Sequence, residues 1–145
     1  MRDTLLSGVV VRALGRVFDV DIGRETLQCE LRGRLKSSVR KTNCPVCVGD
    51  RVKVSRSFDH FGTIEVIEER HSKVSRAAAG EAAFEQVIAA NLDQMVIVVA
   101  AKAPKYTQGL IDRLIVTALN GNMAPVLCIN KMDLSSEDEI EDIRT

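Results

Sequence analysis

The sequence predicts a mixed fold, with a small all-β barrel over residues 1–70 and an incomplete α/β piece over residues 85–145. Before residue 70, five short segments alternate apolar and polar residues and are separated by glycine turns. After residue 85, two continuous apolar runs flank a helical pattern. The charge is also divided, since residues 1–76 carry 15 Lys/Arg and 10 Asp/Glu while residues 77–145 carry 5 and 10. This asymmetry indicates two modules with different partners, although two ordinary surfaces can differ as much.

The barrel strands are expected at residues 6–14, 17–22, 26–31, 51–55 and 63–68. Gly15, Gly23, Gly49 and Gly62 supply the turns. Five short strands of this kind fit a small antiparallel barrel. The aromatic residues of this region are Phe18, Phe58 and Phe61, and a barrel this small needs few large side chains to fill it.

The alternation stops after Arg70. We expect residues 71–84 to be a linker, with a helical tendency where alanines gather at 77–79 and 82–83. The linker would separate the two modules.

The second module begins with the apolar run 95–101, as expected of a strand buried on both faces. Apolar residues then recur at helical spacing between Thr107, a candidate N-cap, and Gly121, a candidate C-cap. Residues 126–129 form a second apolar strand, and Ser136 opens a capping-box pattern for a last helix. The order strand, helix, strand, helix predicts a parallel βαβα unit.

Composition narrows the class of protein. An apolar fraction of 46% and a charged fraction of 28% are typical of a globular chain. The longest apolar run, 95–101, is too short to span a bilayer, and the N-terminus does not look like a secretory signal. We therefore expect a cytoplasmic monomer, no membrane partner, and reduced thiols at Cys29, Cys44, Cys47 and Cys128.

The motif that carries chemistry is Asn130-Lys131-Met132-Asp133, directly after the second apolar strand. Guanine presents N1–H and an exocyclic amine on one edge, and one carboxylate, Asp133, can accept both hydrogen bonds. Asn130 can tie the loop and reach the N7 side of the base, while the stem of Lys131 can lie along the ring. Because ligands bind at the carboxyl ends of parallel strands, the position favours nucleotide binding over a plain polar loop.

The phosphate-binding pattern Gly-x-x-x-x-Gly-Lys-Ser/Thr does not occur in the sequence, and no Asp-x-x-Gly follows a strand in its second half. In GTPases of ordinary order both elements precede the guanine motif. Here a barrel occupies that place. We therefore expect no catalytic residue in this chain.

This order resembles the ribosome small-subunit-dependent GTPase A family (the YjeQ/RsgA type), whose members are circularly permuted GTPases. The resemblance rests on segments spread over nearly the whole chain: Gly8-Val9-Val10, Cys29-Glu30-Leu31-Arg32-Gly33, Val48-Gly49-Asp50-Arg51-Val52, Arg70-His71-Ser72-Lys73-Val74-Ser75-Arg76, Ala90-Asn91-Leu92-Asp93-Gln94, Ile111-Asp112-Arg113 and Asn130-Lys131-Met132-Asp133-Leu134.

The resemblance implies an N-terminal OB-fold followed by the start of a circularly permuted P-loop GTPase domain. It implies the guanine part of a GTP/GDP site, contact with 16S rRNA of the small ribosomal subunit, and a role in 30S maturation. The Mg and Zn sites of the family are expected beyond Thr145. The alternative is a stand-alone OB-fold RNA-binding module that does not hydrolyse nucleotide.

Two weaker signals lie in the barrel region. Five basic residues with no acid among them form a stretch that can follow a phosphate backbone, or a merely solvated loop: Arg32, Arg34, Lys36, Arg40 and Lys41. Since aromatic residues are scarce, folded RNA read by its shape is favoured over single strands. Cys44 and Cys47 have the spacing of metal ligands or of a redox pair, but with no second pair they are expected to be plain loop residues.

Overall fold

The computed structural model describes residues 5–33, 35, 46–77, 85–137 and 140–141. The chain divides into two compact units, residues 1–92 and 93–145. Within the described residues, no helix combines the length and the apolar content needed to cross a membrane.

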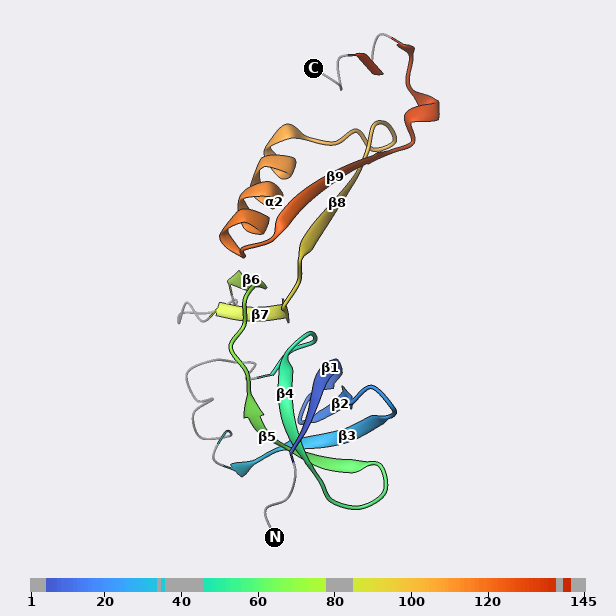
Figure 1. The fold of residues 1–145 in the computed structure, drawn as a ribbon. Helices are drawn as coiled ribbons and strands as arrows, with labels where there is room; N and C mark the ends of the chain where they lie inside the picture. Colours follow the sequence, from blue (N-terminus) through green and yellow to red (C-terminus); the bar gives the residue numbers. More distant parts are fainter. Residues whose placement is uncertain (1–4, 34, 36–45, 78–84, 138–139, 142–145) are drawn as a thin grey trace. The chain divides into compact units, whose positions relative to one another are not determined.

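The first unit contains the expected barrel, which is closed and OB-like (Figure 1). Its strands are β1 (Leu6–Leu14), β2 (Val17–Asp21), β3 (Thr26–Leu31), β4 (Arg51–Arg56) and β5 (Phe61–Ile67). They follow one another around the barrel in the order β1-β2-β3-β5-β4. Every pair is antiparallel except β3–β5, which is parallel and was not foreseen from the sequence.

Alternating side chains of these strands fill the barrel, as the period-two pattern predicts. On β3, Leu27, Cys29 and Leu31 point inward while the residues between them are exposed. The rest of this core includes Val10, Phe18, Val20, Val52, Val54 and Ile64. Of the three phenylalanines in this region, Phe18 is in the core, but Phe58 and Phe61 are 83% and 55% exposed. Small aliphatic side chains fill the interior, so it has no need of further rings.

The expected linker is partly a strand. Residues Lys73–Ala77 form β6, which pairs antiparallel with β7 (Glu85–Ala90), and both lie in the first unit. The amide of Ala90 donates to the carbonyl of Val48 at 3.0 Å, so this hairpin is held against the barrel. Gly49 adopts φ +89°, and a Cβ there would lie 2.0 Å from the Ala90 carbonyl oxygen. Only glycine permits this approach.

A buried ion pair lies beside the hairpin. Asp50 is fully buried, and its carboxylate accepts two hydrogen bonds from the Arg70 guanidinium, at 2.7 and 2.8 Å. The Cys47 amide donates to the same carboxylate at 2.8 Å. These bonds join the segment before β4 to the segment after β5, and thereby fix the barrel's end next to β6 and β7.

The second unit begins with two parallel strands, β8 (Gln94–Ala100) and β9 (Ala124–Asn130), connected through helix α2 (Gln108–Asn120). The helix covers one face of the strand pair (Figure 1), where Ile97, Val99 and Ile111 form a small core. Our expectation that both faces are buried is not met among the described residues, since Val96 and Val98 are 59% and 63% exposed.

The helix ends lie where the sequence predicts them. Thr107 is the N-cap residue of α2, although its side chain makes no capping bond. Gly121 follows the last turn, but the left-handed conformation belongs to Asn122 (φ 59°). Past β9, residues 132–134 form a short 3₁₀ helix, η2 (Met132–Leu134), and the Ile140 amide donates to the Ser136 carbonyl at 3.0 Å. That i to i−4 bond is the beginning of the expected last helix.

Candidate functional site

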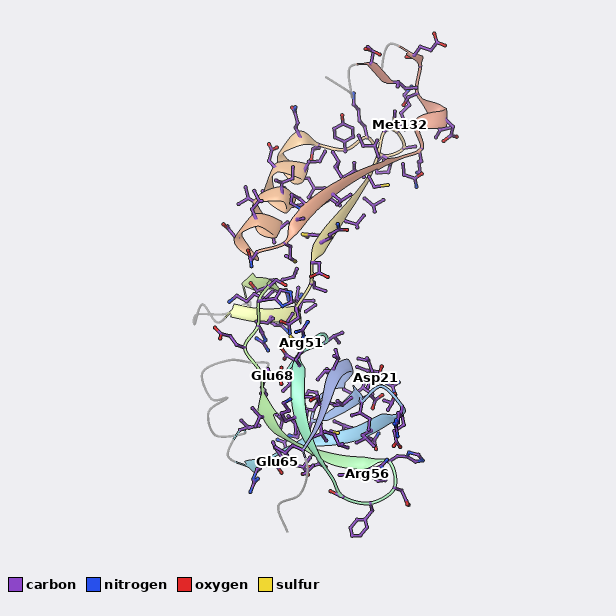
Figure 2. The ribbon with its side chains drawn as sticks, in the orientation of Figure 1. Asp21, Arg51, Arg56, Glu65, Glu68 and Met132 are labelled. Atoms are coloured by element: carbon purple, nitrogen blue, oxygen red, sulfur yellow. The ribbon has the colours of Figure 1, made fainter. Side chains whose placement is uncertain are left out.

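The Asn-Lys-Met-Asp motif lies at the carboxyl end of the parallel pair β8–β9. Asn130 is the last residue of β9, and Met132 and Asp133 belong to η2 (Figure 2 labels Met132). Lys131, between them, has the left-handed backbone conformation (φ 59°, ψ 32°), which turns the chain sharply away from the strand. The strand edge therefore presents the motif as a tight loop, as the sequence predicts.

Hydrogen bonds hold this loop from two sides. The Asn130 side-chain oxygen accepts the Lys131 amide at 2.7 Å, so Asn130 ties the loop. The Lys131 ammonium group donates to the carbonyl of Ala103 at 2.6 Å, in the connection between β8 and α2. The Ala101 amide also donates to the Asn130 carbonyl at 2.9 Å. Sequence reasoning missed the Ala103 partner, because Ala103 contributes only its backbone.

Asp133 points its carboxylate at solvent. The side chain is exposed, and among the described residues no protein group bonds to it, so both oxygens are available to a ligand. The backbone beneath it is fixed, since the Leu134 amide donates to Lys131 and the Ser135 amide to Met132, at 3.2 and 3.0 Å. A carboxylate held in this way can accept two parallel hydrogen bonds from one planar base.

The basic stretch is described only at its beginning. Arg32 is exposed and forms an ion pair with Glu65, which also accepts a hydrogen bond from Ser55 at 3.0 Å (Figure 2 labels Glu65). Part of the charge of Arg32 is thus compensated within the barrel. Four of the expected contact residues lie outside the described residues: Arg34, Lys36, Arg40 and Lys41.

Two of the described cysteines, Cys29 and Cys47, are buried, and Cys128 is exposed. Burial, and secondly the negative charge of Asp19, raises the pKa of the Cys29 thiol to about 11. Cys47 is buried, and its thiol lies 3.6 Å from the Asp50 carboxylate, whereas Cys44 lies outside the described residues. Among the described side chains, no group of three or more His, Cys, Asp or Glu residues could hold a metal ion.

Comparison with protein families gives two matches that together span most of the chain. Residues 7–64 match the family described as the RsgA N-terminal domain, and residues 67–145 match the RsgA GTPase family. The boundary between the matches, at residues 64–67, falls in the last residues of β5.

Curated relatives carry the same RsgA description as the two family matches. The chain is 36% identical over 138 residues to the small ribosomal subunit biogenesis GTPase RsgA of Gemmatimonas aurantiaca, a match that covers 93% of this chain and 45% of the relative. It is 27% identical over 140 residues to the protein of the same description from Clostridium botulinum, covering 95% and 43%. The chain thus spans about half the length of the curated relatives it matches.

Two solved structures share its fold. YloQ, described as a circularly permuted GTPase, superposes with a TM-score of 0.71 at 28% identity, over 97% of this chain and 46% of that one. YjeQ from Thermotoga maritima superposes with a TM-score of 0.76 at 29% identity and the same coverage. The sequence expectation of an OB-like barrel followed by the start of a permuted GTPase domain is therefore confirmed.

Proposed function

This chain belongs to the RsgA GTPase family, and we propose that it supplies the ribosome-contacting barrel and the guanine-reading loop of a GTPase that acts in small-subunit biogenesis. The observation that carries the proposal is the Asn130–Asp133 loop, which ends a parallel strand and presents an exposed carboxylate. The phosphate-binding pattern is not in this sequence, so hydrolysis is assigned to the whole protein of the family and not to these 145 residues.

Base reading would be the task of Asp133. Its two oxygens accept N1–H and the exocyclic amine of guanine, while adenine would bring an acceptor to the same place and leave the carboxylate unpaired. Sites that recognise a base by buried polar groups discriminate by about 10⁴ or more. Asn130 and Lys131 keep the loop in shape through their bonds to the backbone at 131 and at Ala103.

The test is Asp133→Asn in a chimaera that joins residues 1–145 to the remaining part of the Gemmatimonas aurantiaca relative. An amide can donate to the carbonyl that xanthine carries in place of the guanine amine. Losing two charge-assisted bonds should weaken GTP binding about 100-fold, while XTP binds better than in the parent chimaera. Competition of GTP with XTP measures the ratio.

Glu137→Gln is the matched control, because it removes one exposed acid from the same segment outside the motif. It should leave the GTP to XTP ratio unchanged. If the Asp133→Asn chimaera kept the parent chimaera's preference for GTP over XTP, Asp133 would not be the residue that reads the base.

The barrel's proposed partner is ribosomal RNA. Residues 1–76 have an excess of five positive charges, and the basic stretch at 32–41 contributes five cations without an acid. Such a surface attracts a phosphate backbone and releases counterions on binding. The family description of the relatives, small ribosomal subunit biogenesis, is consistent with RNA of the small subunit.

Replacing four of these residues with alanine tests the contact (Arg34, Lys36, Arg40 and Lys41). Binding of the 145-residue chain to small subunits should weaken, and the slope of log K against log salt should flatten by up to about 3, at roughly 0.7 for each phosphate that is no longer neutralised. Replacing Lys102 and Lys105, which lie in the other unit, should leave the slope unchanged. An unaltered slope in the fourfold variant would assign the stretch to solvation.

A further inference from the structure

Two phenylalanines are displayed on one tight turn of the barrel. The turn connects β4 to β5, and the Phe58 side chain is 83% exposed and that of Phe61 55%. The Phe61 amide donates to the Phe58 carbonyl at 2.7 Å, and the Ser57 amide donates to the Phe61 carbonyl at 2.9 Å. These two bonds close the turn on itself, so both rings stand on a backbone of fixed conformation.

The neighbouring strand supports the turn. The Gln28 amide of β3 donates to the His60 carbonyl at 2.7 Å. Arg56 at the end of β4 forms an ion pair with Glu25, and the His60 imidazole lies 3.3 Å from the same carboxylate (Figure 2 labels Arg56). The ionisable groups around the rings are one cation, Arg56, the two acids Glu25 and Asp59, and the His60 imidazole, so positive charge is not in excess there. This turn therefore displays two aromatic side chains without an excess of positive charge, on a unit whose total charge is basic.

We propose that the Phe58–Phe61 turn is a stacking site for unpaired bases of RNA. The inference deepens the RNA contact proposed above and rests on it. Both rings stand on a prearranged backbone, so little conformational entropy is lost when a base stacks on them. Every base has a π-face, so stacking tolerates any sequence, and OB barrels bind oligonucleotides with the loop between strands 4 and 5.

The charge pattern favours RNA over a protein partner. The excess of five positive charges in residues 1–76 selects a polyanion, and within such a ligand the aromatic turn suits the bases while the basic stretch suits the phosphates. The sequence indicated folded RNA read by shape because aromatic residues were few. The structure gathers two of them on one turn, which adds a contact to bases that lie unpaired within a folded RNA.

The experiment compares two fluorescent RNA probes with the 145-residue chain: a stem-loop with eight unpaired bases, and a blunt duplex of equal phosphate number. Wild type should prefer the stem-loop about tenfold. The variant Phe58→Leu/Phe61→Leu should bind both probes alike, with an unchanged salt slope because no charge is removed. Val66→Ala, a change at another exposed apolar side chain on β5, should keep the preference.

A direct reporter is available because the chain contains no tryptophan. Phe58→Trp should keep the affinity, and its fluorescence should be quenched as the stem-loop is added. Binding of the stem-loop without quenching, or a preference unaltered by the leucine pair, would overturn the stacking site and leave the basic-stretch contact standing. The Phe58→Leu/Phe61→Leu variant could also bind both RNA probes as tightly as wild type does, and yet bind intact small subunits more weakly. That result would overturn the stacking site and assign the turn to contact with a ribosomal protein.

Discussion

Removing the guanidinium of Arg70 should destabilise the first unit more than any change at an exposed ion pair. Arg70→Met keeps the apolar stem and leaves the fully buried Asp50 carboxylate without its two bonds of 2.7 and 2.8 Å. Breaking one side of a buried pair costs about 3–5 kcal/mol. The Cys47 amide still donates to Asp50, and the Arg70 side chain is 22% exposed, so we expect the lower end, about 3 kcal/mol.

Urea unfolding followed by circular dichroism measures this loss. With a slope of roughly 1.5 kcal/mol per M, the midpoint for unfolding of the first unit should fall by about 2 M. The matched control is Arg12→Met, which breaks the ion pair with Asp19 at a side chain that is 63% exposed. Such exposed pairs contribute about 0–1 kcal/mol, so its midpoint should move by less than about 0.7 M.

A second substitution separates the loss of charge pairing from the loss of packing. In Asp50→Asn/Arg70→Met the buried group is neutral, and part of the lost stability should return because no uncompensated carboxylate remains. If Arg70→Met and Arg12→Met lowered the midpoint equally, the reasoning that burial makes the Asp50–Arg70 pair stabilising would be refuted.

Thiol labelling, phosphate release and hydrogen exchange each test a further expectation. At pH 8, iodoacetamide should label the exposed Cys128 much faster than Cys29, because a pKa of about 11 keeps the Cys29 thiol protonated below that pH; equal labelling by peptide mass spectrometry would contradict its burial. The 145-residue chain should release no phosphate from GTP above the background of its Asp133→Asn variant, since it has no phosphate-binding loop. Hydrogen exchange should be slower in β1–β5, where each strand has two neighbours, than in β8 and β9, which among the described residues pair only with each other. Similar protection in both units would show that the second is as stable as the barrel.

The site itself was only partly visible in the sequence. The motif at Asn130–Asp133 and its place after a strand could be predicted, because four adjacent residues and a hydrophobic run are local signals. The bond from Lys131 to the Ala103 carbonyl could not, since any residue type at 103 would offer the same atom. The base-reading and RNA-contacting roles of these residues stay predictions until the variants are measured.

By itself, the sequence determined most elements of this protein, although not the strands β6 and β7. Valine content placed β1 and alternation with period two placed β3 to the residue, and the switch to apolar runs and helical spacing placed β8, α2 and β9 within two residues of their ends. Side-chain periodicity follows directly from backbone geometry, so it can be read along the chain.

Only the tertiary structure decided which elements meet. The parallel pairing of β3 with β5, the attachment of β7 to the barrel through Val48 and Ala90, and the burial of Asp50 against Arg70 join residues about twenty to forty positions apart. Such contacts leave no periodic trace in the sequence. The same holds for the phenylalanines: Phe18 and Phe58 are chemically identical, and closure of the barrel alone put one inside and the other on a turn facing solvent.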